Sequence, residues 1–432
     1  MAQSPQEPDS PTPTPRPSPA PPSQRSLGRT FEALHYRDFR LLFIAHMTNS
    51  AAVWMQMIGL PILVIAMTDS PVHLGLVLVA RTVPSMVLGI FSGVFADMFN
   101  RKTILLMTRL SGTALAVWFA AIAVLGPVSL VDIYVFAILR GITMAFDQAP
   151  RRALIPSMVP PHAIVNAMAV TNGGQQMTRA TAPAIAGLMI SLWGIPSAFV
   201  AMAVLYVVGL PFLVLMRIVD HEREGYRGIP RIFRDAGSGI GFALKNPIMR
   251  SSLIVTALYF IFGMSFTNVF APLLASGPLK LDEGGLGWLV AVMGIGGTAG
   301  TLTVAYVSPE RRRGVVLTTS LALFGMLLMG MAGASYLTTP IVAFVVIFFV
   351  GAGQAIFMPL LQSIVLQAAP VQMRGRAMAI LSWDRALVSF GSAVAGFAAG
   401  AFGSQAALLA FGGACAFGGL MLLATGTLRR VD

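Results

Sequence analysis

The chain has 432 residues, of which 56% are hydrophobic and only 11% are charged, and its mean hydropathy is +0.77. A soluble domain does not need this many apolar residues for its core, so the composition predicts an integral membrane protein. The formal net charge of +12 is spread over short basic clusters between apolar runs, without the aromatic-flanked basic face of a nucleic-acid-binding protein. We therefore expect the lipid bilayer, and not nucleic acid, as a partner.

Residues 1–38 are a polar segment whose first part is dominated by Pro, Ser, Gln and Thr, so a disordered cytoplasmic tail is expected there. Twelve apolar stretches follow, each of about 20 residues or more and long enough to cross the hydrocarbon core as a helix. The stretches are 41–67, 73–95, 103–125, 131–155, 164–193, 197–216, 251–275, 286–307, 315–336, 340–366, 378–402 and 406–428. The sequence predicts an all-α integral membrane fold of twelve transmembrane helices, with six-helix bundles at 39–217 and 249–432.

The basic residues predict the orientation, because short cytoplasmic loops carry an excess of Lys and Arg. Every second connection between the apolar stretches is rich in Lys and Arg, whereas the alternate connections together contain one basic residue, Lys280. Both termini are therefore predicted to be cytoplasmic. The basic middle segment, 218–248, is predicted to carry an amphipathic helix on that surface, because Ile229, Ile232, Phe233 and Ile240 recur at helical spacing. A plain surface linker is the alternative, since three glycines in this segment weaken helix formation.

The two predicted bundles resemble each other in sequence when 210 is added to a position in the first half. Gly141 then falls on Gly351, Pro160 falls on Pro370, and residues 167–169 fall on 377–379, with Ala-Met-Ala in both places. Six crossings per repeat give both halves the same orientation. This predicts two parallel pseudo-repeats, which can move about a binding site near the membrane midplane.

The loop between the second and third stretches reads GVFADMFNRK and resembles the loop signature of the major facilitator superfamily. Met98 and Asn100 depart from that signature. The matching residues are Gly93, Asp97, Arg101 and Lys102. The resemblance implies the major facilitator fold and a latch between the two halves on the cytoplasmic side, formed by these four residues. A basic cluster that serves only to set the topology is the alternative.

A second stretch resembles one branch of this superfamily, which includes enterobactin-type siderophore exporters and macrolide-efflux proteins. It comprises FDQAPRRALIPSMV from Phe146, NAMAV from Asn166, and RATAPAIAG from Arg179. The fifth-helix segment is also similar to the drug-antiporter signature, with Pro183 and Gly187 matching it. The resemblance implies export across a bacterial cytoplasmic (inner) membrane, in preference to uptake.

Several ionisable side chains are predicted to lie within the membrane, where a charge is costly unless it faces a cavity or an opposite charge. They are Arg81 in the second helix, Arg140 in the fourth, Arg179 in the fifth, and Asp384 and Arg385 in the eleventh. Arg140 resembles the buried arginine that opens the superfamily's fourth-helix motif. For each residue, a structural salt bridge between helices is an alternative to a role in transport.

Three residues are candidates for proton coupling, namely Asp384, Arg140 and Asp147. Asp384 is preferred because it lies about eight residues inside its helix, near the midplane, where a carboxyl group can change protonation state as the cavity opens to either side. A fixed salt bridge to an arginine is its alternative role. Asp147 lies beside Arg151 and Arg152 near the cytoplasmic end of its predicted helix, so a permanently ionised pair is the alternative there.

Further polar side chains at membrane depth are candidates to line a central cavity, although each could instead form a hydrogen bond between helices. The cavity candidates are Asn49, Gln56, Arg81, Asn172, Gln175, Arg179, Asn268, Gln354, Gln362 and Arg385.

The sequence offers little for enzymatic chemistry. It contains no Gly-Lys dipeptide, so a P-loop is excluded, and its five histidines lack metal-ligand spacing. We therefore expect no enzyme, no metal and no cofactor. The predicted function is that of a monomeric secondary active transporter, which couples protons to the export of a small, largely apolar molecule, drug-like or siderophore-like, by alternating access. Uptake by proton symport and a non-transporting sensor or scaffold on the same fold are the alternatives.

Overall fold

The computed structural model describes residues 31–98, 100–147, 151, 154–155, 157–217, 246–281, 284–307, 313–336, 340–368 and 384–426. All regular secondary structure in these ranges is helical, which confirms the predicted all-α fold. The predicted tail is described only from Phe31 onward, where the short 3-10 helix η1 (Glu32–His35) precedes the first long helix. Most of the middle segment, including the predicted amphipathic helix, lies outside the described residues.

The first half of the chain contributes six long helices and one further 3-10 turn, η2 (Pro161–Ala163). The long helices are α2 (Arg37–Thr68), α3 (Pro71–Met98), α4 (Arg101–Leu125), α5 (Leu130–Ala145), α7 (Ile164–Trp193) and α8 (Pro196–Val214). One prediction is wrong in this half: the fourth apolar stretch extends to residue 155, but α5 ends at Ala145. The stretch runs across a proline at position 150, which has no backbone N–H to donate to residue 146 in a continued helix.

The second half also makes six crossings, and the first of them is composite. It runs from α10 (Pro247–Leu258) through two π-helical segments, η3 (Tyr259–Gly263) and η4 (Phe266–Phe270), into α11 (Ala271–Ser276). The other crossings are α12 (Gly285–Val307), α13 (Arg313–Tyr336), α14 (Pro340–Ala368), α16 (Asp384–Phe402) and α17 (Ser404–Thr425). Apolar periodicity predicts the crossing but does not distinguish π turns from α turns. The π turns are the ones that frequently mark functional sites.

Several helices begin where a side chain caps the first free backbone N–H groups. Asn100 accepts hydrogen bonds from the backbone nitrogens of Lys102 and Thr103 at the start of α4. Asn100, which replaces a glycine of the superfamily signature, is thus the N-cap residue of α4. At the start of α5, Ser129 and Asp132 form a reciprocal capping box.

The twelve crossings correspond to the twelve predicted apolar stretches. Within the described ranges, nine helices are long and apolar enough to span a membrane. The other three crossings fall short of these limits for different reasons. Helix α5 is short, and the described apolar part of α16 begins only at Ala386. Helix α7 carries several amide side chains and the charged Arg179. A polar helix inside a membrane bundle must direct those side chains away from lipid.

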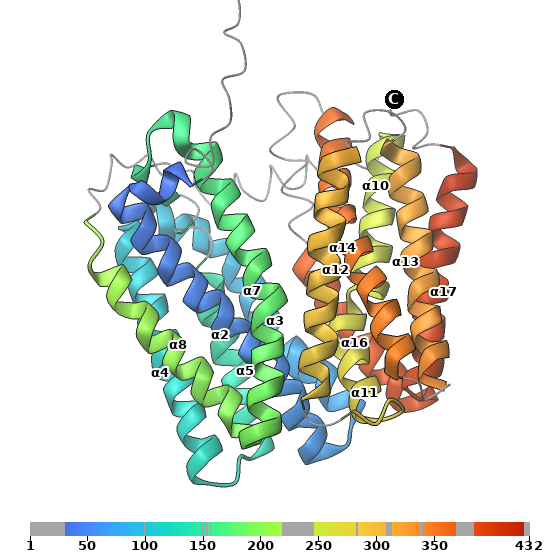
Figure 1. Cartoon of the computed structure of the whole chain (residues 1–432), viewed down its shortest axis with the longest axis horizontal. Coiled ribbons are helices and arrows are strands. Elements are labelled where there is room, and N and C mark those ends of the chain that lie inside the picture. The colour runs from blue at the N-terminus through green and yellow to red at the C-terminus, as the bar shows by residue number, and fades with distance from the viewer. Residues whose placement is uncertain are drawn as a thin grey trace, which may run out of the picture.

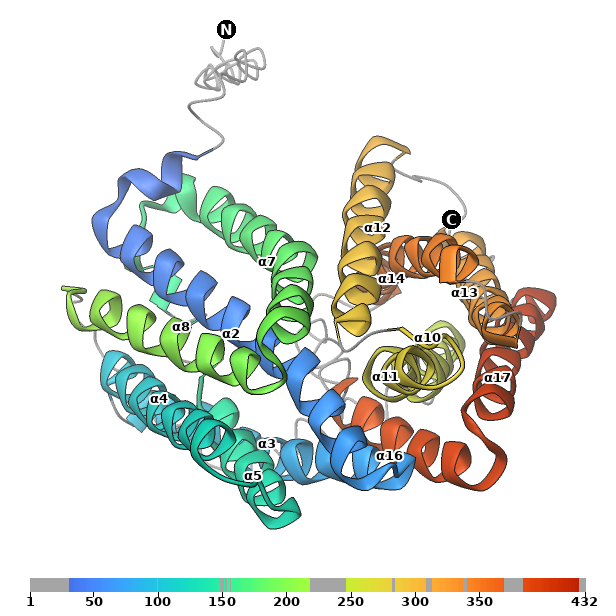
Figure 2. The same ribbon diagram turned by 60° about the horizontal axis from the view of Figure 1, so that its bottom comes forward.

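The helices form two groups of six crossings that lie side by side, and Figures 1 and 2 show the first half of the chain beside the second. Between the groups, α3 packs against α16 and α7 packs against α12. These pairs are the second with the eleventh crossing and the fifth with the eighth, so a shift by six crossings exchanges one pair with the other. This relation is the one expected of two parallel repeats.

The contacts between the two groups depend on glycines. A Cβ atom on Gly187 of α7 would lie 2.9 Å from the Cα atom of Gly287 of α12. A Cβ atom on Gly75 of α3 would lie 2.8 Å from the carbonyl oxygen of Ser392 of α16. Small residues therefore let the helices approach closely at one end of the molecule. Toward the other end, where α2 begins and α17 ends, the two groups separate (Figure 1).

Candidate functional site

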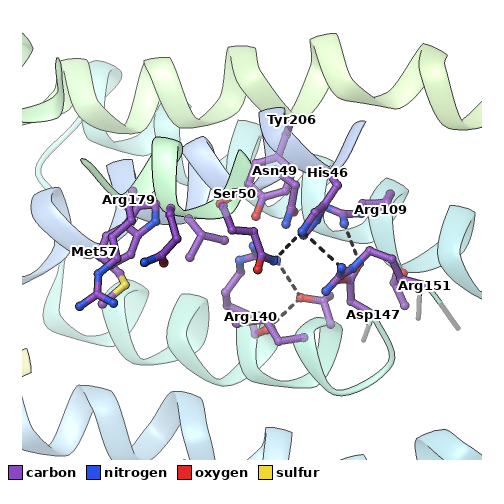
Figure 3. A pocket seen from close by; sticks show the side chains of 17 residues that line it. His46, Asn49, Ser50, Met57, Arg109, Arg140, Asp147, Arg151, Arg179 and Tyr206 are labelled. Atoms are coloured by element: carbon purple, nitrogen blue, oxygen red, sulfur yellow. Dashed lines mark hydrogen bonds and ion pairs between the residues drawn. The ribbon is translucent and has the colours of Figure 1, made fainter. Parts of the chain in front are cut away.

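A polar cavity lies in the first half, among α2, α4, α5, α7 and α8 (Figure 3). Its volume is about 330 Å³, within the range of small-molecule sites. The polar and charged side chains that line it are His46, Asn49, Ser50, Thr108, Arg109, Arg140, Thr143, Asp147, Arg151, Gln175, Gln176 and Arg179, joined by the phenol of Tyr206. A buried concentration of charge at membrane depth is costly to maintain, which makes this cavity the candidate functional site.

Two arginines of the cavity share one carboxylate. The Nη2 atom of Arg109 lies 2.9 Å from Oδ1 of Asp147, and the Nε atom of Arg151 lies 3.5 Å from Oδ2 of the same residue. Both arginines are buried, with 6% of each residue exposed. In such surroundings the charges must be paired, because the loss of one partner leaves an uncompensated ion in a poorly solvated site. This triad joins α4 to the turn that follows α5.

His46 of α2 extends the triad toward α7. Its Nε2 atom lies 3.2 Å from Nη1 of Arg151 and 2.6 Å from Nε2 of Gln175. A guanidinium only donates hydrogen bonds, so the Nε2 atom of His46 must be the acceptor and carries no proton. Its Nδ1 atom is buried without a hydrogen-bond partner among the described residues. The imidazole is therefore neutral in this arrangement, with its proton on Nδ1.

Arg140 of α5 is buried and is held by uncharged groups. Its Nε atom donates to Oε1 of Gln56 at 3.2 Å, and Nη1 donates to the hydroxyl of Thr143 at 3.2 Å. The guanidinium carbon lies 4.8 Å from the ring centroid of Tyr206, a cation–π distance. The hydroxyl of Tyr206 is itself buried, and no residue in the described part of the chain forms a hydrogen bond with it.

Arg179 of α7 connects the two halves of the molecule. It donates a hydrogen bond to Oε1 of Gln354 on α14, and its guanidinium carbon lies 6.0 Å from the Trp54 ring centroid. The Nε2 atom of Gln354 in turn lies 3.3 Å from the hydroxyl of Thr267 in η4. This chain of contacts places the rim of the cavity at the junction between the bundles.

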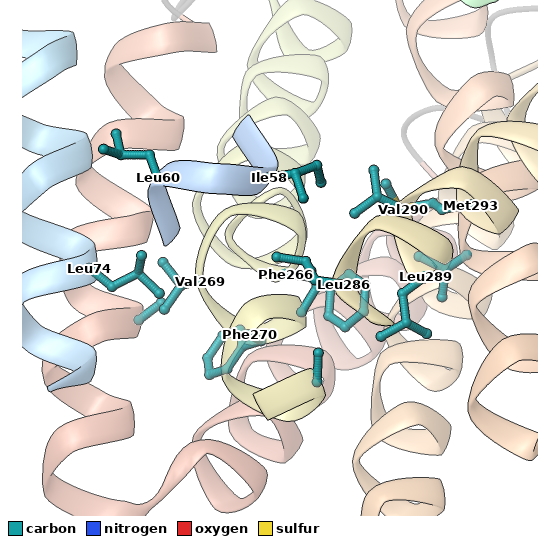
Figure 4. Close-up of a cluster of buried hydrophobic side chains, with 14 of the residues drawn as sticks. Ile58, Leu60, Leu74, Phe266, Val269, Phe270, Leu286, Leu289, Val290 and Met293 are labelled. Atoms are coloured by element: carbon teal, nitrogen blue, oxygen red, sulfur yellow. The ribbon is translucent and has the colours of Figure 1, made fainter. Parts of the chain in front are cut away.

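Apolar side chains from both halves close one end of this junction (Figure 4). Ile58, Leu60 and Leu74 of the first half belong to the same buried cluster as Phe266 and Phe270 of η4. Residues of α12 complete it, namely Leu286, Leu289, Val290 and Met293. The cluster seals the end of the junction at which the glycine contacts lie, while the helices separate toward the other end.

The structure places the predicted site residues in four groups. Asn49, Arg140, Asp147, Gln175 and Arg179 line the polar cavity. Gln56, Arg81 and Asn268 line a smaller neighbouring cavity between α2, α3 and η4. Gln354 reaches the first cavity through Arg179, whereas Asn172 is exposed on α7 and Gln362 is half-buried on α14. The side chains of Asp384 and Arg385 lie outside the described part of the chain, so their roles remain predictions.

The predicted latch is described only through Lys102. Its Nζ atom donates a hydrogen bond to the carbonyl oxygen of Met216 at 2.6 Å, just beyond the end of α8. Both residues belong to the first half, so this bond does not join the two halves. The side chains of Asp97 and Arg101 lie outside the described residues, and Gly93 has no side chain to contribute. The latch between the halves therefore stays a prediction.

Sequence reasoning missed His46 and Arg109, both of which belong to the charged network. A signal for His46 was present: residues 46, 49, 50, 53, 54 and 57 all line the cavity and follow the spacing of one helix face. A polar residue one turn before Asn49 should have been included with it. Arg109 lies inside the third apolar stretch and should have been treated like the other intramembrane arginines.

The sequence profile of the Major Facilitator Superfamily matches residues 42–389, which is most of the chain. The chain belongs to this superfamily. Its members are transporters and not enzymes, which confirms the prediction that the protein is not an enzyme. The predicted resemblance to this family, and the twelve-helix fold that it implied, are likewise confirmed.

Curated relatives of the chain include transporters of siderophores and drugs. The Staphyloferrin A transporter of Staphylococcus aureus is 24% identical over 361 residues, covering 81% of this chain and 86% of that protein. The multidrug efflux pump Tap of Mycolicibacterium fortuitum is 24% identical over 388 residues, covering 86% and 91%. The enterobactin exporter EntS of Shigella dysenteriae is 24% identical over 307 residues, covering 68% and 71%.

Solved structures share the fold at lower identity. The nucleoside transporter NupG superposes with a TM-score of 0.74 at 11% identity, over 90% of this chain and 99% of that structure. A D-xylose-proton symporter superposes with a TM-score of 0.69 at 14% identity, over 91% and 97%. Together these findings establish an integral membrane protein with the architecture of a secondary transporter.

Proposed function

We propose that this transporter exports a small molecule across a bacterial cytoplasmic membrane as a monomer, coupled to protons, by alternating access. The observation that carries the proposal is the charged cavity beside the junction of the two halves, which is sealed at one end by apolar and glycine contacts. A site near the junction becomes accessible to one side and then the other when the halves rock about it. The relatives described by name as an efflux pump and an exporter favour outward transport.

His46 is the proton-binding group that the geometry favours. Its Nε2 atom is a neutral acceptor that lies between Arg151 and Gln175. The charged groups around it are Arg109 on α4 and, after α5, Asp147 and Arg151. Arg140 and Tyr206 lie farther along the cavity. Protonation of Nε2 would replace the acceptor with a donor and add a positive charge opposite two arginines. The contact between His46 and Arg151 would then break, which would release α2 from the turn after α5.

We expect His46→Gln to uncouple the transporter. A glutamine keeps an oxygen that can accept from Arg151, but it does not take up a proton. In proteoliposomes of the purified full chain, with ethidium and 2-naphthoate as solutes, proton-driven transport should be lost while gradient-free counterflow persists. If the variant keeps proton-driven transport, coupling resides elsewhere, and Asp384→Asn measured in the same two assays tests the remaining predicted carboxylate.

The same vesicles also test the wider function. Movement of neither solute in either direction by the wild-type chain would contradict transport of these solute classes and would favour the sensor or scaffold alternative. Accumulation on the side that corresponds to the cytoplasm would favour uptake over export. The direction is read against vesicle sidedness, which is measured by labelling the Lys280→Cys variant described below in the same vesicles.

Both termini are proposed to be cytoplasmic, so the end of the molecule near Lys280 should face outward. Lys280 is exposed between α11 and α12 and is suited to labelling. A Lys280→Cys substitution, made after the buried Cys415 is replaced by serine, should react with an impermeant maleimide in intact cells. Labelling that occurs only after the cells are lysed would reverse the orientation.

A further inference from the structure

We infer that the polar cavity selects an organic anion, whose acidic group is held by Arg140 and Arg179 while its apolar body packs against Trp54 and Met57. This inference deepens the proposed transport function and rests on it. All four side chains line the cavity, from α2, α5 and α7. Figure 3 labels Met57, Arg140 and Arg179.

The first step is the imbalance of charge in the lining. Four arginines line the cavity, namely Arg109, Arg140, Arg151 and Arg179, and Asp147 is the carboxylate among the lining residues. His46 is neutral in this arrangement and adds no charge to the lining. Positive charge therefore exceeds negative charge by three. A cavity of one sign with poorly polarisable walls concentrates ions of the other sign.

The second step is that the carboxylate is already engaged. Asp147 is paired with Arg109 and Arg151, which leaves Arg140 and Arg179 with neutral partners. The partners of Arg140 are an amide, a hydroxyl and an aromatic ring, and Arg179 has an amide and a more distant ring. Among the side chains that the structure describes, none supplies a carboxylate to either arginine. Arg140 is buried and Arg179 is half-buried. Cations withdrawn from water are normally paired, so an anionic ligand would complete this site.

The third step is that the site retains unused hydrogen-bonding capacity. Within the ranges that the structure describes, the hydroxyl of Tyr206, a residue only 4% exposed, has no hydrogen-bond partner although it lines the cavity beside Arg140. The Nε atom of Arg179 likewise lacks one. A planar carboxylate can accept two parallel N–H bonds from a guanidinium, and such charge-assisted bonds are about twice as strong as those to a neutral amide. Carboxylate binding at Arg179 would therefore compete with Gln354.

That competition connects ligand binding to the two halves. The bond from Arg179 to Gln354 spans α7 and α14, which belong to different bundles. An anion that takes over the guanidinium would remove this bond and loosen the junction at the cavity rim. The remaining lining, with Val53, Trp54, Met57 and Met144, is apolar. The ligand class is thus an acid with an apolar or aromatic body, and not a small inorganic ion.

The test uses 2-naphthoate and its uncharged analogue 2-naphthamide, which share an aromatic body and differ in charge. Calorimetric titration of the purified full chain in uncharged detergent should show that naphthoate binds and that the amide binds at least about tenfold more weakly, because a hydrogen bond to a charged group contributes about 1.5–3 kcal/mol. Arg179→Gln should weaken naphthoate binding by about tenfold or more and leave the weak amide binding unchanged. Arg179→Lys, which keeps the charge, should recover part of the affinity.

Arg250→Gln is the matched control, since Arg250 is exposed at the start of α10 and away from the cavity. It should bind both compounds as the wild type does, and gel filtration should show that every variant is folded. Equal binding of the acid and the amide, unchanged naphthoate binding in Arg179→Gln, or no binding of either compound would overturn the inference. Naphthoate that binds through Arg179 but is not moved in vesicles would instead contradict the proposed transport function and leave the anion site standing.

Discussion

Asp147→Asn is expected to destabilise the protein by about 3–5 kcal/mol, because it leaves two buried arginines without their shared counter-charge. Asparagine preserves the size of the side chain and one acceptor oxygen, so the change isolates the charge. Both Arg109 and Arg151 are 6% exposed and cannot be compensated by bulk water. The measurement is the unfolding transition of the purified protein, followed by its helical signal.

The order of effects among variants identifies the cause. Arg109→Gln should cost less than Asp147→Asn, because Asp147 keeps Arg151 as a partner. Asp132→Asn is the control, since this carboxylate is exposed at the N-terminus of α5 and its loss should cost only about 1 kcal/mol of capping energy. If Asp147→Asn unfolds like the wild type and loses transport alone, the triad is part of the transport mechanism and not of the structural framework.

The helices and their grouping could be predicted from the sequence because the bilayer imposes simple rules. A helix must be apolar for about 20 residues to cross the hydrocarbon core, and basic residues gather in alternate loops. The third, sixth and ninth apolar stretches all coincide closely with α4, α8 and α13. The end of α5 was misplaced because the stretch was extended across Asp147, Pro150 and two arginines to the apolar residues at 153–155, whereas the helix ends at Ala145.

The site could be predicted only in part, because apolar spacing does not determine helix rotation. Intramembrane position alone selected Arg140 and Arg179, which line the cavity, since a charge at that depth must face a cavity or a partner. The pairing of Arg179 with Gln354 joins residues far apart in the chain and depends on how the two bundles meet. The same holds for His46, whose partners come from the turn after α5 and from α7. Such pairings require the tertiary arrangement.

The contact between α7 and α12 gives the second large effect, since Gly287→Ala is expected to open the sealed end of the junction. A Cβ atom at position 287 would lie 2.7 Å from the backbone nitrogen of Gly187. That neighbour is backbone and does not rotate away, so the two helices must separate. The arrangement with this end closed should lose population, and transport should fall because alternating access needs both states.

The readout is a cysteine at position 60, where Leu60 is 6% exposed within the apolar cluster that seals the junction. With Cys415 replaced by serine, Leu60→Cys should label slowly with a maleimide in the wild-type background and several-fold faster with Gly287→Ala. Gly330→Ala on α13 is the control, because an added Cβ there meets nothing within 4 Å. Faster labelling with the control too would indicate general loosening of the fold. Unchanged labelling with Gly287→Ala would mean that the glycine contact does not hold the closed end together, and that the apolar cluster alone maintains the seal.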